Sequence, residues 1–458
     1  MKLSIPSYVE NVIDRLEKNG YEAYIVGGSL RDMLLGRVPK DYDITTNALP
    51  NEVEMLFTDY KTVNIGKEFG TIIICHDMGP VEVTTFRKEG KYLDGRRPQW
   101  VSFSNKIEDD LSRRDFTINA IAYNVNRGII DPFDGQKDIS RKIIRTVGAP
   151  KERFSEDYLR IMRGIRFAAE LDFEIEEETL KAAKSYSRYV EKVSMERIAE
   201  EFFKILMCNI PSKGIRLLEE VGLLNIVLPE LIPAIGFDQR NPHHEMNVYN
   251  HILCVLDNTP PILQVRLAAL FHDIGKPHTL TVDEEGIGHF YGHDKLGADI
   301  ARKALKRLKA SNELTDKVCI LVKEHMNHHV HFKDKGLKKL ISRVGENEIF
   351  NLIVLQKADI MCSNQEAKVD HILEREKRIR EIIDSNEAYK VSQLNINGND
   401  LMDLGFHQGP ILREVLQYLL ERVMEEPDKN KKEFLKKMAM EKFLKNNSSN
   451  NKGEEIDC

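Results

Sequence analysis

Two aspartates, Asp41 and Asp43, are separated by one residue in the segment Asp41-Tyr42-Asp43-Ile44, which is typical of a β-strand. Alternate residues of a strand point to the same face, so this spacing predicts two carboxylates side by side. Such carboxylates repel each other unless a cation lies between them, and oxygen ligands at an open site suit Mg²⁺. In phosphoryl transfer, Mg²⁺ ions activate the attacking hydroxyl and stabilise the leaving oxygen. An isolated Asp-x-Asp pair, however, is more often an ordinary solvated turn.

A glycine-rich turn precedes these aspartates and suits phosphate binding. Gly27-Gly28-Ser29 lies between an expected strand at residues 22–26 and a short helix. Glycines such as Gly28 let the backbone approach a triphosphate, and the helix N-terminus offers free N–H groups. Arg31, in the first turn of that helix, can reach a phosphate with two N–H donors. The alternative is a plain strand–turn–helix in which Ser29 caps the helix.

Two further segments place charged side chains where apolar ones are expected. Glu82 interrupts the apolar strand Val81-Glu82-Val83, so it either faces solvent or adds a third catalytic carboxylate beside Asp41 and Asp43. The segment Arg113-Arg114-Asp115 can position a ribose hydroxyl and a phosphate. Its alternative is a helix start with a surface ion pair. The pattern alone leaves both questions open.

A third segment, Glu156-Asp157-Tyr158-Leu159-Arg160, predicts recognition of a base. Residues three apart on a helix are neighbours, so Asp157 and Arg160 would present one acceptor and one planar donor together. Cytosine and adenine both offer an exocyclic amine beside an unprotonated ring nitrogen, whereas uracil and guanine reverse that pattern. Arg163 and Arg166 continue the spacing of three and favour a triphosphate. The alternative is an ordinary ion pair between Asp157 and Arg160.

Four motifs in one order resemble those of the class II tRNA nucleotidyltransferases and bacterial poly(A) polymerases: GGSLRD at 27–32, DYDI at 41–44, RRDFTINA at 113–120 and EDYLRIMRGIRFA at 156–168. The similarity covers roughly residues 20–240, and residues 396–413 resemble the tail of CCA-adding enzymes. The resemblance implies a seahorse-like fold of head, neck, body and tail. It also implies that Asp41 and Asp43 bind Mg²⁺ and that the following residues bind the nucleotide: Gly28, Arg31, Arg114, Asp115, Asp157, Arg160, Arg163 and Arg166.

Two segments refine the resemblance within this family. Residues 86–103 resemble the flexible loop of CCA-adding and A-adding enzymes, and its basic residues are plausible phosphate partners: Arg87, Lys88, Lys91, Arg96 and Arg97. The segment at residues 66–70 resembles the tRNA enzymes rather than the poly(A) polymerases. The motifs do not distinguish a full CCA-adding enzyme from one that adds only the last A.

A second group of residues could bind a metal through nitrogen and oxygen ligands. His251, His272, Asp273 and Asp359 occur in the order of the HD phosphohydrolase superfamily, and ALFHDIGKP around His272 resembles its usual sequence. Mixed histidines and carboxylates suit a divalent transition-metal ion. The resemblance implies a metal-activated water that attacks a phosphoester, with two further candidate ligands or phosphate contacts, His293 and His325. The alternative is a region that only supports the RNA.

The elements that must position these residues indicate an α+β chain. We expect a small mixed α/β nucleotidyltransferase head followed by helices, in five parts: head 1–145, helical neck 146–240, HD-type body 241–385, helical tail 386–445 and disordered end 446–458. The net charge of -6 requires that any nucleic-acid contact depend on local basic patches. Because the six cysteines include no Cys-x-x-Cys pair, we expect neither a Cys-rich zinc site nor a disulfide framework, and a reduced, cytoplasmic location. No apolar run reaches the ~20 residues of a membrane span.

These observations predict a template-independent tRNA nucleotidyltransferase that uses CTP, ATP and Mg²⁺, with an HD-type hydrolase activity. Its partners would be tRNA and the nucleotides, without a membrane, and the sequence leaves any protein partner undetermined. An A-adding enzyme is the first alternative, and poly(A) polymerase is a weaker one. An HD phosphohydrolase with an RNA-binding N-terminal half, or an RNA-binding protein without activity, would not need clustered metal-binding carboxylates.

Overall fold

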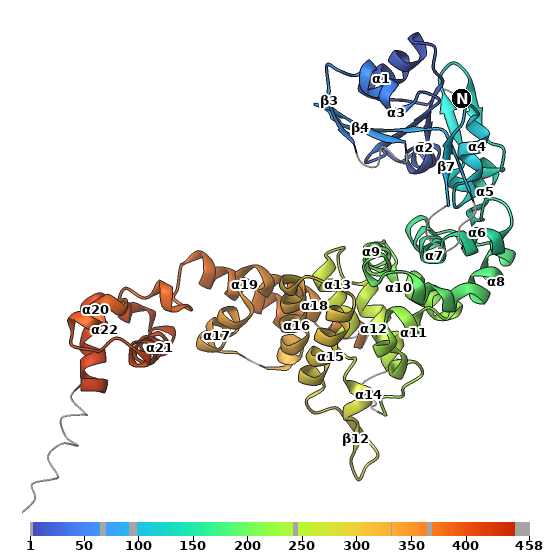
Figure 1. Ribbon diagram of the computed structural model, residues 1–458. Coiled ribbons are helices and arrows are strands. Elements are labelled where there is room, and N and C mark those ends of the chain that lie inside the picture. Colours follow the sequence, from blue (N-terminus) through green and yellow to red (C-terminus); the bar gives the residue numbers. More distant parts are fainter. Residues whose placement is uncertain are drawn as a thin grey trace, which may run out of the picture. The chain divides into compact units, whose positions relative to one another are not determined.

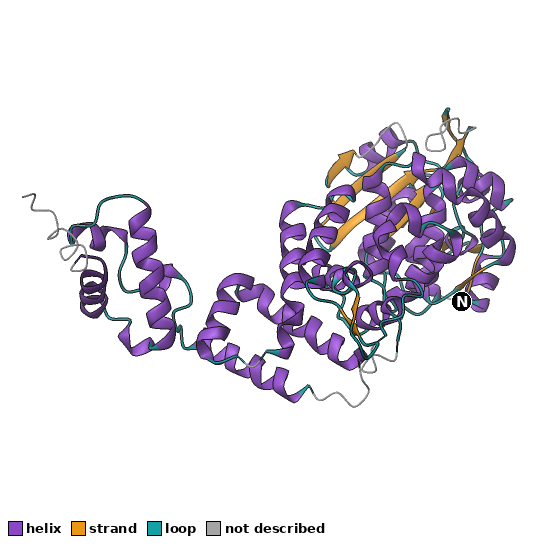
Figure 2. Cartoon of the chain, turned by 90° about the horizontal axis from the view of Figure 1, so that it is seen from below, coloured by secondary structure: helices purple, strands orange, loops and turns teal. Residues whose placement is uncertain are grey.

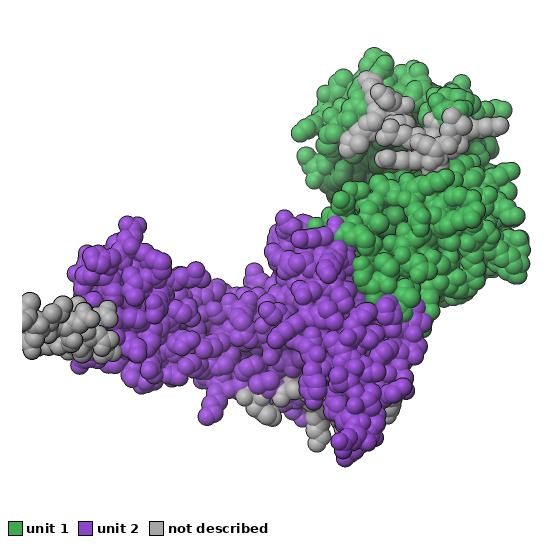
Figure 3. All heavy atoms as spheres, turned by 60° about the horizontal axis from the view of Figure 1, so that its bottom comes forward, with its two compact units in different colours: residues 1–232, 307–310 green, residues 233–306, 311–458 purple. Residues whose placement is uncertain are grey.

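A computed structural model describes residues 3–64, 70–90, 99–240, 246–330, 332–363 and 369–444. The chain divides into two compact units, unit 1 of residues 1–232 and 307–310, and unit 2 of residues 233–306 and 311–458 (Figure 3). The predicted disordered end at 446–458, the segment at 66–69 and the loop positions at 91–98 lie outside the described residues.

A seven-stranded sheet forms the core of the first part of unit 1 (Figure 1). The three strands predicted from the sequence are confirmed, β1 (Ala23–Val26), β2 (Tyr42–Thr46) and β5 (Gly79–Thr85), and β4 (Thr71–His76) pairs with β5. Three more complete the order β3-β4-β5-β2-β1-β8-β9, namely β3 (Lys61–Asn64), β8 (Ala122–Asn124) and β9 (Gly128–Ile130). Figure 2 shows that the strands gather in one part of the chain, which confirms a mixed α/β head followed by helices.

The register of the central strands brings the acidic residues together. Strand β2 pairs in parallel with β5, and Asp43 lies opposite Glu82. On its other edge β2 pairs antiparallel with β1, where Asp43 lies opposite Val26. Side chains that lie opposite each other on neighbouring strands point to the same face of a sheet. Glu82 therefore shares a sheet face with Asp43.

Helices flank the sheet and then replace it. The N-terminal helix α1 (Ser7–Lys18) has Asn19 as its C-cap. Gly20 follows with a φ of +89°, a backbone conformation typical of glycine after a helix. Helix α2 (Gly27–Leu34) follows β1 directly. Helices occupy the part of the chain where a helical neck was expected, residues 146–240: α6 (Pro150–Glu156), α7 (Leu159–Leu171), α8 (Glu177–Tyr186), α9 (Met195–Leu206) and α10 (Pro211–Val221).

Unit 2 is built mainly of helices. Its first part carries the four histidine and aspartate residues predicted above as metal ligands. The helices that position them are α12 (Val248–Asp257), α13 (Leu263–Phe271), α14 (Lys276–Thr279), α15 (His293–Arg307), α16 (Asn312–Glu324) and α18 (Glu346–Ser363). The last described helices, α20 (Gly398–Asp403), α21 (Pro410–Glu425) and α22 (Lys432–Ala439), share an apolar cluster that includes Leu401, Leu419 and Leu435. Among the described helices, none is both long and apolar enough to cross a membrane.

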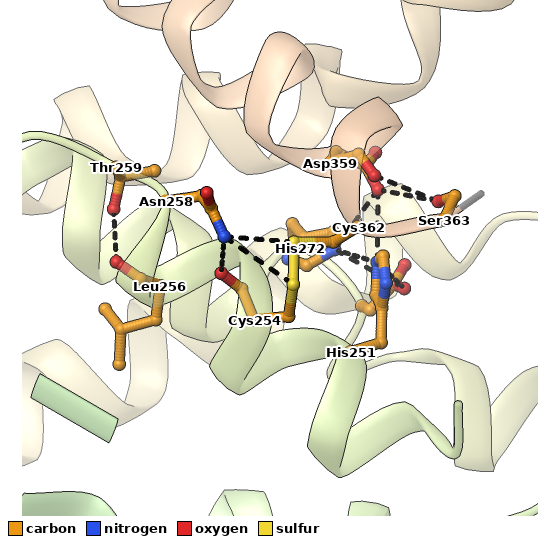
Figure 4. Close-up of a disulfide and its surroundings, with 10 residues drawn as sticks. His251, Cys254, Leu256, Asn258, Thr259, His272, Asp359, Cys362 and Ser363 are labelled. Atoms are coloured by element: carbon orange, nitrogen blue, oxygen red, sulfur yellow. Dashed lines mark hydrogen bonds and ion pairs between the residues drawn. A yellow bond between two sulfur atoms is a disulfide. The ribbon is translucent and has the colours of Figure 1, made fainter. Parts of the chain in front are cut away.

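One disulfide, between Cys254 of α12 and Cys362 of α18, was not expected from the sequence (Figure 4). The expectation used the absence of closely spaced cysteines, but these two are 108 residues apart in sequence. Their helices pack side by side, which places the two Cα atoms 5.9 Å apart. Spacing along a chain does not report such long-range neighbours, so the expectation is wrong at this pair.

Candidate functional site

A cleft of 720 Å³ in unit 1 gathers the three predicted catalytic carboxylates and the predicted nucleotide-binding residues. Its wall includes both aspartates, Glu82 and the predicted nucleotide-binding set: Gly28, Arg31, Asp41, Asp43, Glu82, Arg114, Asp115, Asp157, Arg160, Arg163 and Arg166. Side chains that the sequence did not single out for this role complete it, among them Asn119, Phe167 and Arg197. The volume suits a nucleotide-sized ligand.

The three carboxylates lie where two strands of the sheet meet the glycine turn. Asp41 immediately precedes β2, Asp43 lies within it, and Glu82 lies on β5. The turn approaches so closely that a Cβ atom at residue 27 would lie 3.2 Å from Oδ2 of Asp43, and Gly27 has a φ of +69°. Both the space and the backbone conformation therefore require glycine at this position.

Ser29 does not cap the helix, contrary to the alternative considered from the sequence. The N-cap of α2 is Val26, and no side chain caps it. The Ser29 hydroxyl instead donates to the carbonyl of Val26 at 2.8 Å and accepts from the backbone N–H of Asp43 at 3.4 Å. Ser29 thus ties the turn to the strand that carries Asp43.

The carboxylates repel each other, and this shows in their protonation. Burial, followed by the charge of the neighbouring Glu82, raises the pKa of Asp43 to about 6, and Arg114 opposes the shift. Burial, followed by the charge of Asp41, also raises the pKa of Glu82. Three oxygen ligands whose shared charge is unfavourable without a cation fit a site for Mg²⁺.

The opposite wall is rich in arginine, and buried partners hold several of the guanidinium groups. Arg31 is 4% exposed and donates to Oδ1 of Asn119 at 3.0 Å. The guanidinium groups of Arg31, Arg163 and Arg166 all lie over the ring of Phe167, with the Cζ atoms 5.2, 5.5 and 4.0 Å from its centroid. One aromatic ring therefore gathers three cations that the sequence presented as separate motifs.

The aspartates within this wall determine how its arginines are oriented. Arg113 and Arg114 pair with the buried Asp110, at 2.7 and 3.1 Å, rather than with the neighbouring Asp115. Asp115 instead pairs with Arg163 at 2.6 Å. Burial by itself would raise the pKa of Asp115, but the guanidinium groups of Arg163 and Arg160 outweigh it and lower that pKa to about 2. Asp115 is thus a fixed anion.

The predicted helical relation between Asp157 and Arg160 is wrong. Helix α6 ends at Glu156, and Asp157 has an extended backbone, with φ -145° and ψ 109°, before α7 begins at Leu159. Its carboxylate accepts from the N–H of Leu159 at 3.0 Å and pairs with Arg197 at 2.8 Å. Arg160 pairs with Glu156 instead. The break between the helices nevertheless leaves both Asp157 and Arg160 on the wall of the cleft.

Two buried N–H groups in this wall have no hydrogen-bond partner among the described residues, Nε of Arg114 and Nη1 of Arg197. Buried polar groups are almost always paired, so unpaired cationic donors that line a cleft indicate an anionic ligand. Arg197 lies on α9, 40 residues beyond Asp157, and its place in the cleft was not predicted from the sequence. The only signal in the sequence is an arginine on the face of a distant helix, which indicates nothing without the fold.

A second cluster lies within unit 2 and brings together His251 of α12, Asp359 of α18, and His272 and Asp273, which directly follow α13. Figure 4 shows His251, His272 and Asp359. Nε2 of His251 is 3.2 Å from Nε2 of His272 and 3.1 Å from Oδ1 of Asp359. Oδ2 of Asp273 is 3.4 Å from both Nε2 atoms. The structure therefore brings together the four residues that the sequence predicted as metal ligands, although up to 108 residues separate them.

Hydrogen bonds to the backbone fix which imidazole nitrogen faces the cluster. Nδ1 of His272, His293 and His325 lies 2.8, 2.7 and 2.6 Å from the carbonyl three residues earlier. Each Nδ1 therefore donates its proton outward, which leaves the lone pair of Nε2 directed inward. Lone pairs converging at such distances favour a bound cation, so these residues fit a divalent transition-metal ion.

Asp273 joins this set to a second group of possible ligands. Its Oδ1 atom lies 3.4 Å from Nε2 of His293 and 3.8 Å from Nε2 of His325. Burial and the neighbouring His272 lower the pKa of His325 to about 3, which keeps that imidazole neutral as a ligand must be. Lys276 holds the other oxygen of Asp273 at 2.7 Å. His293 and His325 thus lie where the sequence placed candidate extra ligands.

Three protein-family models match the chain. One described as "Poly A polymerase head domain" matches residues 23–145, and one described as "Probable RNA and SrmB- binding site of polymerase A" matches residues 172–235. A third, described as "HD domain", matches residues 240–364. The first covers the sheet with its carboxylates, and the third covers the histidine cluster.

Several known proteins are similar to the chain over much of its length. A CCA-adding enzyme of Pediococcus pentosaceus is 34% identical over 92% of this chain and 93% of its own length. A CCA-adding enzyme of Streptococcus thermophilus is 49% identical over 48% of this chain, and that match spans 55% of the relative. The crystal structure of the Bacillus stearothermophilus CCA-adding enzyme in complex with CTP is 27% identical, with a TM-score of 0.73, over 97% of this chain and 100% of the other.

The raised pKa of Asp43 predicts a stability effect in metal-free protein. Between the usual carboxyl pKa of 3.8 and about 6, the folded state binds more protons than the unfolded chain. Stability therefore falls as the pH rises through that window and stays lower above it. We expect Asp43→Asn to stabilise unit 1 by on the order of 1–3 kcal/mol at about pH 8, and by little near pH 4.

Thermal unfolding with a chelator present checks this, and fluorescence reports unit 1 because the only tryptophan, Trp100, lies there. Asp77→Asn, which removes an exposed carboxylate of the same unit, is the control and should change little. A lower Tm for Asp43→Asn at about pH 8 would contradict the assignment of a strained, shared charge.

Proposed function

The chain belongs to the family of CCA-adding enzymes, and from that premise we propose that it is a tRNA nucleotidyltransferase that builds the CCA end from CTP and ATP without a template. The observation that carries the proposal is one cleft with three carboxylates on one side and unpaired arginine N–H donors on the other. Such a cleft offers a metal site and a triphosphate site within reach of each other.

Asp41, Asp43 and Glu82 would hold Mg²⁺, which supplies activation of the tRNA 3′-hydroxyl and stabilisation of the leaving pyrophosphate. The protein positions the nucleotide with Arg31, whose guanidinium is fixed by Asn119, and with the free N–H groups of Arg114 and Arg197. Gly27 and Gly28 leave room for the phosphates at the start of α2. Because these groups are already paired or buried, little reorganisation is needed when the nucleotide binds.

Selection of C and A would depend on Asp157 and Arg160, which line the same cleft. Asp157 is held by Arg197 and by the backbone N–H of Leu159, and Arg160 is held by Glu156. A carboxylate can accept from the exocyclic amine of either base, and a guanidinium can donate to the adjacent ring nitrogen. The fixed orientation of both groups would therefore select the base in place of a template. Uracil and guanine present the reverse pattern of hydrogen-bond donors and acceptors.

Extension of a single tRNA tests the activity. Protein with Mg²⁺, CTP and ATP should add three nucleotides to a tRNA that ends at the discriminator base. Asp43→Asn should lower the rate at least about 1000-fold, because a metal ligand is lost, while tRNA binding stays within about threefold. Asp77→Asn, on the surface of the same unit, should extend normally. Growth only from a tRNA that already ends in CC would instead identify an A-adding enzyme.

Base selection has its own test in the same assay. Arg160→Ala should raise the use of UTP relative to CTP by about tenfold or more, because it removes a donor that only C and A can use. Lys151→Ala, an exposed residue of α6, should leave the ratio of rates unchanged. A wild-type ratio in Arg160→Ala would remove this residue from base recognition.

A second function is favoured by the histidine cluster of unit 2. We propose that His251, His272, Asp273 and Asp359 bind a divalent transition-metal ion, which supplies activation of a water for attack on a phosphoester. The Nδ1 hydrogen bond of His272 described above fixes the tautomer of that ligand, and Lys276 holds Asp273 in place. This group lies wholly within unit 2, so its chemistry can proceed without the cleft of unit 1.

Chelator-treated protein supplied with Mn²⁺, Co²⁺ or Ni²⁺ should hydrolyse bis(p-nitrophenyl) phosphate or p-nitrophenyl phosphate. Asp273→Asn should lose hydrolysis and metal uptake, since one carboxylate contacts every histidine of the cluster, and should retain tRNA extension. Asp299→Asn, an exposed residue of α15, should retain both activities. Metal content measured by mass spectrometry distinguishes a lost site from an inactive one. Equal metal binding by wild type and Asp273→Asn would refute the assignment.

A further inference from the structure

A stack of tyrosines lies next to the nucleotide cleft, and the roles proposed above do not use it. The rings of Tyr158 and Tyr189 are stacked, with centroids 5.3 Å apart and 21° between their planes. Tyr186 extends the group at 5.8 Å from Tyr189. Tyr158 is the N-cap of α7, and Tyr189 belongs to the 3-10 helix η3 (Ser187–Lys192). All three rings are half-buried, so each keeps part of its surface exposed to solvent.

Two exposed cations accompany these rings, and no ion pair to a carboxylate is seen for either within the described part of the chain. The Cζ atom of Arg188 lies 4.8 Å from the ring centroid of Tyr189, and its Nη2 donates to the Tyr189 hydroxyl at 2.8 Å. Nζ of Lys192 lies 5.1 and 5.9 Å from the centroids of Tyr189 and Tyr158. Most of their N–H donors are therefore available to an external anion.

The position of the stack connects it to the site of nucleotide addition. Asp157 lines the cleft, and Tyr158 is the next residue in the chain. The carboxylates and arginines of the cleft account for the metal and for the incoming nucleotide. The RNA end that receives this nucleotide needs a surface of its own beside them, and the stack begins one residue from the cleft wall.

We propose that Tyr158, Tyr189, Arg188 and Lys192 form a platform that binds the single-stranded 3′ end of the RNA substrate. The proposal rests on the nucleotidyltransferase function above. Every base has a π face, so aromatic rings bind unpaired nucleotides with little sequence preference, while cations follow the phosphates. Double-stranded RNA keeps its base faces inside the helix, so the rings select an unpaired end. Sequence-tolerant contacts suit an end whose last nucleotide changes at each addition.

Binding of two fluorescent RNA hairpins to the full-length protein tests the platform. The hairpins share one stem, and only one of them carries a single-stranded 3′ overhang. Tyr158→Leu and Tyr189→Leu, which keep apolar bulk without a π face, should each raise the Kd for the overhang RNA by about 5- to 50-fold. Tyr158→Phe and Tyr189→Phe keep the ring and should bind within about twofold of wild type. None of the four should change the Kd for the blunt hairpin.

The cations have a matched test. Arg188→Gln combined with Lys192→Gln should reduce the slope of log Kd against log salt by about 1.4 for the overhang RNA, the effect of two single-strand phosphates. Lys181→Gln combined with Lys184→Gln is the control, because these exposed lysines of α8 already pair with glutamates. An unchanged slope in the first pair, or an equal change in the control pair, would overturn the role of Arg188 and Lys192.

Extension kinetics separate the platform from a purely structural role. The leucine variants should raise KM for tRNA and leave KM for CTP unchanged, whereas distortion of the cleft would raise both. Equal loss of overhang and blunt RNA, or no loss of either, would overturn the proposal. If wild-type protein binds the overhang selectively but extends no tRNA, the nucleotidyltransferase function fails and the platform stands as an RNA site.

Discussion

Repulsion among Asp41, Asp43 and Glu82 is the constraint around which unit 1 is arranged. The pairing of β2 with β5 fixes Asp43 opposite Glu82, so the backbone ladder holds like charges together that would otherwise separate. Burial strengthens the conflict and raises the pKa of Asp43 to about 6. A cation removes the conflict, and catalysis of phosphoryl transfer needs a cation at this point. Because glycine has no side chain, the turn at Gly27 can lie close to Asp43. The same absence of a Cβ atom leaves space there for phosphates.

The arginine wall shows how a chain with a net charge of -6 can bind an anion. Buried carboxylates stand behind the guanidinium groups and orient them: Asp110 holds Arg113 and Arg114, Asp115 holds Arg163, and Glu201 holds Arg166 at 2.6 Å. These pairs keep the arginines in place without using all of their donors, as the unpaired Nε of Arg114 shows. The local arrangement of charge, not the total, determines what the cleft binds.

The side chains of the histidine cluster of unit 2 are also held in fixed orientations, but by different hydrogen-bond partners. Backbone carbonyls, rather than carboxylates, orient its imidazoles, because three of them donate Nδ1–H to the residue three positions earlier. The helices that carry His251 and Asp359 are linked by the disulfide between Cys254 and Cys362, each cysteine lying three residues after one of the ligands (Figure 4). One chain therefore holds two clusters of potential metal ligands, which differ in ligand chemistry, in separate compact units.

The sequence by itself determined the local chemistry: the strand that carries Asp41 and Asp43, the glycine turn, the run of arginines after Asp157 and the four residues of the histidine cluster. The first three depend on periodicity and on short motifs, which neighbouring residues specify directly, whereas the histidine cluster was expected from the resemblance to the HD superfamily. Only the tertiary structure placed Glu82, which stays exposed, opposite Asp43 on the same face of the sheet, since that depends on which strand lies beside β2. It also separated Asp157 from the helix of Arg160, paired it with Arg197 from another helix, and joined Cys254 to Cys362. Contacts between residues 40 or 108 positions apart arise from the packing of whole elements, and no local pattern encodes that packing.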